Sequence, residues 1–292
     1  MTKRVLLLGA SGFIGKNLCE AIKKDIRYEL LAPTRSELNL LDANACRMYL
    51  QHSQPDYVIH SAVNISSAEG SLQSFFNILN HRALFGHLIQ IGSGAEYDRR
   101  ICSPQVIEQD FGKSIPTDSY GLAKYLIARE LNATCRDKVT NFRLFGVFGK
   151  HEDINRRFIS NNIVRVLAGL PISINQDVVF DYIDVQDFCD FLVKILPRLP
   201  LEGVSYNFSA DRPVSLSFLA HVIKSQMHVE QDIQIKNKDF GREYTGSSKK
   251  LFSEVDAYKF RPLEESIRDL ICFYQKSMTE DMIQIFKDKS NA

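Results

Sequence analysis

Residues 5–15 read Val5-Leu-Leu-Leu-Gly9-Ala-Ser-Gly12-Phe-Ile-Gly15. The apolar run before Gly9 is typical of a buried parallel strand, and the glycines start where that strand should end. Residues 16–24 then have helical spacing, with apolar side chains on one face and lysines on another. Strand, glycine turn and helix in this order form the context that a dinucleotide-binding fingerprint requires.

Each glycine of this fingerprint has its own expected role. Gly9 allows the tight turn, Gly12 lets the backbone approach a pyrophosphate, and Gly15 lets the helix pack close to the strand. The free N–H groups at the helix N-terminus would then face the phosphates. We therefore expect the cofactor contacts of this stretch to come from Gly9, Ser11, Gly12, Phe13, Ile14 and Gly15.

Composition narrows the class of protein. The chain has 292 residues, 45% of them apolar, which is enough to bury a sizeable core. Its 36 basic and 35 acidic residues leave a formal net charge of +1, with no basic stripe or block to suggest nucleic acid or a membrane surface. The N-terminal apolar run is too short to span a membrane and lacks a small-residue cleavage site. We expect a soluble, cytoplasmic protein.

The cysteines are widely spaced and include no C-x-x-C pair. They are Cys19, Cys46, Cys102, Cys135, Cys189 and Cys272. This spacing favours reduced thiols over a disulfide framework or a zinc site, and the histidines lie in contexts that do not suggest a metal.

Strands and helices alternate through the first half of the chain. We predict strands at 29–32, 57–60, 88–92 and 141–148, and helices at 42–51, 69–82 and 120–135. Alternation of this kind is typical of an α/β fold, a doubly wound parallel sheet of Rossmann type with helices on both faces. Only about thirty residues (61–88) separate two of these strands, so this segment should hold one shortened helix.

The sequence changes character after Gly149. We predict a helix ending near residue 167, strands at 178–185 and 204–208, a helix at 215–227 and a loop at 236–250. The expected division is a dinucleotide-binding domain over 1–150, completed by about 177–208, and a smaller substrate-binding lobe over 151–176 and 209–292.

Tyr120 and Lys124 are four residues apart and therefore share one face of the predicted helix. A lysine ammonium beside a phenol stabilises the phenolate and lowers the tyrosine pKa toward the working range, so Tyr120 could act as a general acid or base. Ser93 ends a predicted strand, where open α/β sheets bind ligands. Its hydroxyl could hydrogen-bond the substrate oxygen that Tyr120 protonates.

With these motifs in place, the chain resembles the extended short-chain dehydrogenase/reductases, the sugar-nucleotide epimerase/dehydratase/reductase family. The resemblance rests on the glycine trio, on Ser93, Tyr120 and Lys124, and on the segments 143–149, 180–187 and 206–216, and it covers nearly the whole chain. It implies that Ser93, Tyr120 and Lys124 form a catalytic triad and that the C-terminal lobe holds a nucleoside-diphosphate sugar. It also implies a homodimer.

The second predicted strand indicates which dinucleotide is bound. An NAD site usually carries an acid about 20 residues past the glycines, whereas this strand ends in Ala32-Pro-Thr34-Arg35. A guanidinium suits a 2′-phosphate, so we predict NADP(H) in preference to NAD(H). Residues 35–42 are similar to the corresponding part of GDP-fucose synthases. Further cofactor contacts are expected from Thr34, Arg35, Asn39, Leu40, Ser61, Ala62, Val63, Tyr120 and Lys124.

The residues after Ser93 bear on the reaction. The family's dehydratases carry an Asp-Glu pair there, but this chain has Gly94 and Ala95, and Glu96 should point away by strand alternation. GDP-fucose synthases use a cysteine where Ala95 stands, which argues against double epimerisation. We expect NADPH-dependent reduction of a nucleotide-activated 4-keto-6-deoxy sugar. Two alternatives are C4 epimerisation of a nucleotide sugar and a non-catalytic NADP(H)-binding module. Arg242, in the late loop, is the candidate for the substrate diphosphate beside Ser93.

Overall fold

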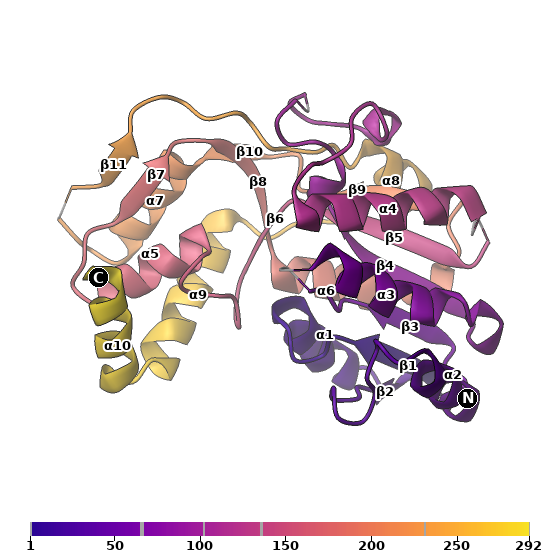
Figure 1. Ribbon diagram of the computed structural model, residues 1–292. Coiled ribbons are helices and arrows are strands. Elements are labelled where there is room, and N and C mark those ends of the chain that lie inside the picture. Colours follow the sequence, from indigo (N-terminus) through magenta and orange to yellow (C-terminus); the bar gives the residue numbers. More distant parts are fainter. Residues whose placement is uncertain (1, 65–66, 102, 135–136, 231, 292) are drawn as a thin grey trace.

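A parallel sheet of six strands forms the centre of the computed structural model, which describes residues 2–64, 67–101, 103–134, 137–230 and 232–291 (Figure 1). The strand order is β2-β1-β3-β4-β5-β9, and every neighbouring pair is parallel. The strands are β1 (Lys3–Leu8), β2 (Tyr28–Leu31), β3 (Tyr57–His60), β4 (His87–Ser93), β5 (Val139–Leu144) and β9 (Ser205–Phe208). The predicted fold class is confirmed.

Alternate residues of β1 supply two separate cores, because side chains along a strand point to opposite faces. Val5 and Leu7 pack with α1 (Phe13–Lys23) and α6 (Val185–Ile195) on one face. Leu6 and Leu8 pack on the other face with α2 (Ala43–Ser53), α3 (Ala68–Leu79) and α4 (Ser119–Thr134). Helices on both faces are what a near-continuous apolar strand requires.

Helix ends follow the capping chemistry of the sequence. At the start of α2, the Asp42 side chain accepts a hydrogen bond from the Ala45 N–H. At the start of α3, the Ser67 side chain accepts one from the Gly70 N–H. The predicted helices at 42–51, 69–82 and 120–135 are confirmed to within a few residues, although Cys135 itself lies outside the described residues. Helix α1 begins at Phe13, three residues earlier than predicted, with Gly12 at its N-cap.

The predicted strand at 141–148 is wrong as a single element. The chain leaves the central sheet after Leu144, and β6 (Gly146–Phe148) joins a different sheet of order β10-β8-β6. The other members are β8 (Val179–Asp184) and the antiparallel β10 (Pro213–Ser215). Phe145 therefore lies at the point where the chain passes from one sheet to the other.

A third core lies beside the central sheet, in the lobe at the left of Figure 1. It is built by α5 (Phe158–Leu167), α7 (Leu216–Gln226), α9 (Leu263–Ser277) and α10 (Glu280–Asn291), beside the small sheet of β7 (Ser173–Gln176) and β11 (Gln234–Asn237). The predicted loop at 236–250 begins inside β11 and ends in α8 (Lys249–Glu254). Sequence patterns did not predict β7, α6, α9 or α10.

No helix within the described ranges is long and apolar enough to cross a membrane. Among the described cysteines, Cys19, Cys46, Cys189 and Cys272 carry free thiols. Cys102 lies outside the described residues, as Cys135 does.

Candidate active site

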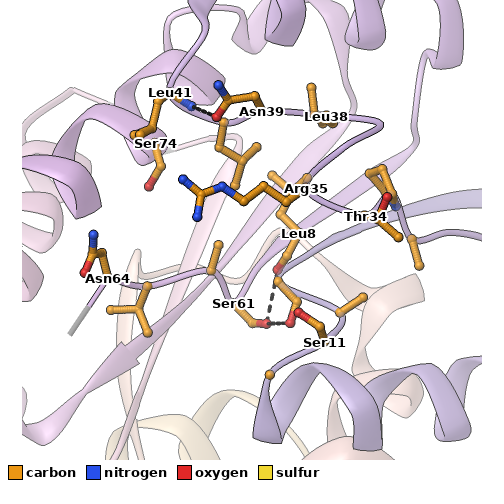
Figure 2. Close-up of a pocket in the computed structure, with 18 of the residues that line it drawn as sticks. Leu8, Ser11, Thr34, Arg35, Leu38, Asn39, Leu41, Ser61, Asn64 and Ser74 are labelled. Atoms are coloured by element: carbon orange, nitrogen blue, oxygen red, sulfur yellow. Dashed lines mark hydrogen bonds between the residues drawn. The ribbon is translucent and has the colours of Figure 1, made fainter. Parts of the chain in front are cut away.

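A cavity of about 630 Å³ opens at the carboxyl ends of β1, β2 and β3 (Figure 2). This is the edge of an open α/β sheet where ligands bind. Of the residues predicted to bind the cofactor, those that line this cofactor cavity are Gly9, Ser11, Gly12, Thr34, Arg35, Asn39, Leu40, Ser61, Ala62 and Val63.

The glycine turn is shaped by close backbone contacts. Gly9 has φ +84°, and a Cβ there would come within 2.6 Å of the Ala62 nitrogen. A Cβ on Gly15 would collide with the Gly9 carbonyl oxygen, so Gly15 packs under the turn instead of lining the cavity. Phe13 and Ile14 do not line the cavity, and both are partly buried against the core that α1 covers. Gly12 is exposed at the α1 N-terminus.

Arg35 extends into the cofactor cavity (Figure 2). Its side chain is exposed, and within the described part of the chain it makes no ion pair. The nearby Glu37 carboxylate accepts hydrogen bonds from the Thr34 N–H at 2.7 Å and from the Thr34 hydroxyl at 2.9 Å. Glu37, the acidic residue nearest to Arg35 in the sequence, therefore already bonds Thr34. The Arg35 guanidinium is available to an anion in the cavity.

Tyr120 and Lys124 lie on the first turns of α4. The Lys124 Nζ is 6.0 Å from the centre of the Tyr120 ring and donates a hydrogen bond of 2.6 Å to the Ile91 carbonyl on β4. Lys124 is buried and Tyr120 half-buried. Helix α4 packs closely against the short helix η2 (Gly94–Glu96) that follows β4, because Gly121 has no side chain and a Cβ there would be 2.9 Å from the Ala95 carbonyl oxygen.

Ser93 ends β4, two residues after Ile91. Its Oγ accepts a hydrogen bond of 3.1 Å from the Ala95 N–H, which starts the short helix η2 (Gly94–Glu96). The structure therefore brings Ser93, Tyr120 and Lys124 to one end of β4, as the sequence predicts. It leaves Arg242 exposed in the late loop, without a hydrogen bond or ion pair to any described residue.

A buried ion pair lies beneath Ser93. Arg143 Nε on β5 is 2.5 Å from Glu96 Oε2, and both side chains are 1% exposed. Glu96 Oε1 accepts a hydrogen bond of 3.1 Å from the Ser93 N–H, and Arg143 donates to the Tyr97 hydroxyl at 3.1 Å. Tyr97 in turn donates to Asn207 Oδ1 on β9 at 2.8 Å. Glu96 is thus committed to this network, as strand alternation predicts, and is not available as an acid or base.

Two residues that the sequence did not indicate lie at the same end of β4. The hydroxyl of Tyr244 lies against Gly94, since it would collide with a Cβ placed there. The Arg99 guanidinium lies over the Tyr244 ring, 4.1 Å from its centre. Burial raises the pKa of Tyr244 to about 12, against the opposing effect of Arg99. The only sequence signal was their presence in two polar loops.

The model of the NAD dependent epimerase/dehydratase family matches residues 5–207, more than half of the chain. The chain belongs to this family. It is therefore an NAD(P)-dependent enzyme of the oxidoreductase/epimerase type, and the predicted resemblance is confirmed.

The relatives include an enzyme named for a GDP-sugar and a protein named for polysaccharide biosynthesis. The chain is 23% identical over 294 residues to GDP-6-deoxy-D-talose 4-dehydrogenase from Aggregatibacter actinomycetemcomitans, covering 91% of this chain and 96% of the relative. It is 31% identical over 209 residues to the spore coat polysaccharide biosynthesis protein SpsK of Bacillus subtilis, covering 68% and 71%.

A solved structure with the same fold is MlghC, a GDP-mannoheptose C4 reductase from Campylobacter jejuni with NADP bound. The TM-score is 0.78 at 17% identity, and the match covers 94% of this chain and 98% of that chain. The shared fold agrees with the order of the strands in the central sheet.

Proposed function

We propose that this enzyme uses NADPH to reduce a nucleotide-activated 4-keto-6-deoxy sugar at C4. The observation that carries the proposal is the grouping of a serine, a tyrosine and a lysine at the end of β4, with an unpaired arginine in the adjoining cofactor cavity. The named relatives support it, because a 4-dehydrogenase and a C4 reductase both act on the C4 position of a GDP-sugar.

The residues of the cavity fit NADP(H). Backbone N–H groups at the start of α1 and the uncovered Gly12 suit a pyrophosphate. Arg35 suits a 2′-phosphate, because a guanidinium can donate two parallel hydrogen bonds to it. When bound, the cofactor supplies the hydride for C4.

The protein's own residues supply the proton. We propose that the Tyr120 hydroxyl donates its proton to the C4 oxygen as the carbonyl becomes an alcohol, and that the Lys124 ammonium stabilises the resulting phenolate. Lys124 uses one of its three donors on the Ile91 carbonyl, which fixes its position and leaves two free donors. The Ser93 hydroxyl would hydrogen-bond the same substrate oxygen.

Two other activities of the family fit this site less well. Elimination of water needs an acid and a base beside the sugar, but Gly94 and Ala95 carry neither, and the Glu96 carboxylate is held by Arg143. Epimerisation at carbons next to the ketone needs a proton-transferring group where Ala95 stands. Reduction needs only the groups that are present.

We also propose a division of labour along the chain. Residues 1–150, together with about 177–208, would bind the cofactor, and residues 151–176 and 209–292 would bind the sugar nucleotide. Strand β9 supports the first part because it completes the central sheet. Strands β6 and β8 of the first part and β10 of the second form one separate sheet, so both parts contribute to it.

The test is NADPH oxidation by the purified protein with GDP-, dTDP-, CDP- and UDP-4-keto-6-deoxyhexoses. We expect stoichiometric loss of NADPH with one of these, and a fall of about 10²–10⁴-fold in kcat for Tyr120→Phe with NADPH affinity retained. Interconversion of a UDP-hexose without net loss of NADPH would instead show a C4 epimerase. Tight NADPH binding with no turnover of any sugar would contradict both.

A further inference from the structure

Arg99 is an exposed cation at the reacting end of β4. Its guanidinium lies 4.1 Å from the centre of the Tyr244 ring, and within the described residues it makes no ion pair. The next residue, Arg100, is paired with Asp98 at 2.6 Å. Arg99 is close enough to Tyr120 and Asp118 to interact with them electrostatically. Asp118 is occupied at the start of α4, where it accepts a hydrogen bond from the Gly121 N–H at 2.8 Å.

Tyr244, whose ring lies under the Arg99 guanidinium, is held in place by backbone and ring contacts. The Tyr244 N–H donates to the Val179 carbonyl at 2.9 Å, and its ring packs against Phe145 and Phe180 at 5.3 and 5.7 Å. The loop that carries Tyr244 is also joined to the loop that carries Arg99, since the Val106 N–H donates to the Thr245 carbonyl at 3.1 Å. The guanidinium therefore sits on a rigid surface beside Ser93 and Tyr120.

The hydroxyl of Tyr244 points to a ligand independently. Tyr244 is 5% exposed, and its hydroxyl makes no hydrogen bond of good geometry with a described residue, although the Ser93 and Arg99 side chains are its polar neighbours. Buried hydroxyls are almost always satisfied, and leaving one unpaired is costly. This hydroxyl lies against Gly94, next to Ser93, where a substrate would be held.

We propose that Arg99, stacked on Tyr244, binds the sugar-proximal phosphate of the nucleotide sugar and so sets the distance between that phosphate and Tyr120. This inference rests on the proposed function. It replaces the exposed Arg242 as the first candidate for the diphosphate.

The chemistry of the proposed substrate identifies the anion. A 4-keto-6-deoxy sugar carries a methyl group at C6 and no carboxylate, so its only anionic groups are the two phosphates. The phosphate on C1 lies one pyranose ring away from the reacting C4. A guanidinium beside Tyr120 is therefore within reach of that phosphate and can donate two parallel hydrogen bonds to it. The contact with the Tyr244 ring holds the guanidinium at this position.

The test measures binding of free nucleotides to the enzyme saturated with NADP⁺, so that the cofactor cavity is occupied. Calorimetry compares GDP, UDP, CDP and dTDP with their monophosphates, which lack the sugar-proximal phosphate. In the wild type we expect the matching diphosphate to bind about 10–100-fold more tightly than its monophosphate. Arg99→Gln should abolish that ratio, and Arg99→Lys should keep part of it, because a lysine retains the charge but not the paired donors.

Three further measurements make the outcome decisive. Arg198→Gln, which removes an exposed arginine paired with Asp256, should leave the ratio unchanged. Tyr244→Phe should retain the ratio, because free nucleotides lack the sugar that the hydroxyl would contact beside Ser93, and Tyr244→Leu should reduce it, because leucine lacks the ring under Arg99. NADP⁺ affinity and thermal unfolding of each variant verify that the protein is folded.

The two hypotheses fail in different ways. If the wild type binds a nucleoside diphosphate and Arg99→Gln keeps the full ratio, the role of Arg99 is wrong while the proposed function stands. If the wild type binds none of the nucleotides at millimolar concentration, both are overturned.

Discussion

The cofactor cavity and the substrate side of the active site are built in different ways. The cavity is lined by short segments that directly follow the first three strands: the glycine turn 8–12 after β1, residues 32–35 and 38–41 after β2, and residues 61–64 after β3. The substrate side is formed by side chains of two loops, 97–118 and 243–248, joined by hydrogen bonds across more than a hundred residues. The glycine turn of the cavity can be recognised from a short sequence motif, whereas the substrate side exists only once the chain has folded.

The largest effect that would test this contrast is at Glu96. Glu96→Gln removes the charge that faces the buried Arg143 beneath Ser93. We expect a loss of about 3–5 kcal/mol in the free energy of unfolding, because an uncompensated buried charge remains. Urea unfolding measures it. The matched surface variant Arg198→Gln should lose no more than about 1 kcal/mol. Equal losses for the two variants would show that the network does not hold the substrate side together.

A second prediction concerns the cofactor cavity. Arg35→Gln should weaken NADPH binding by about 10–100-fold and leave NADH binding unchanged, because only NADPH carries the 2′-phosphate that the guanidinium would bind. Fluorescence titration with both cofactors gives the two affinities. The control is Arg47→Gln, which changes an exposed arginine on α2 that donates hydrogen bonds to Asn44 and Gln51. Unchanged NADPH affinity in Arg35→Gln would contradict the prediction of NADP(H).

The smallest effect concerns Glu152, a buried carboxyl in the C-terminal half. Burial raises its pKa to about 8, and the Ser160 hydroxyl donates to it at 2.5 Å. The folded protein keeps this proton up to about pH 8, whereas the unfolded chain releases it near 4.5, so stability falls as the pH rises between these values. Between pH 6 and 7 the wild type should lose up to about 1.4 kcal/mol more than Glu152→Gln.

Urea unfolding of the wild type and of Glu152→Gln at the two pH values measures this difference. Glutamine keeps the size of the side chain and an oxygen for Ser160, so the two proteins should differ in their pH dependence. Parallel pH profiles would mean that Glu152 is ionised in the folded protein.

The comparison also shows which features the sequence could predict. The glycine turn, Tyr120 and Lys124 depend on neighbours within a few residues, so their positions on β1, α1 and α4 follow from local patterns. The break between β5 and β6 does not, because an apolar strand pattern continues through Phe145 although the chain changes sheets there. The contact between Arg99 and Tyr244 has no local sequence signature either, because the two residues are 145 positions apart in the sequence.

The central claim is that hydride is delivered to C4 while Tyr120 supplies the proton. The most direct measurement uses NADPH carrying deuterium on the transferred position, with the nucleotide 4-keto-6-deoxy sugar that the enzyme turns over, and locates the label by NMR. We predict one deuterium at C4 of the sugar for each NADPH consumed, and none at C3 or C5. A product without deuterium at C4, or a changed sugar with no NADPH consumed, would contradict this account.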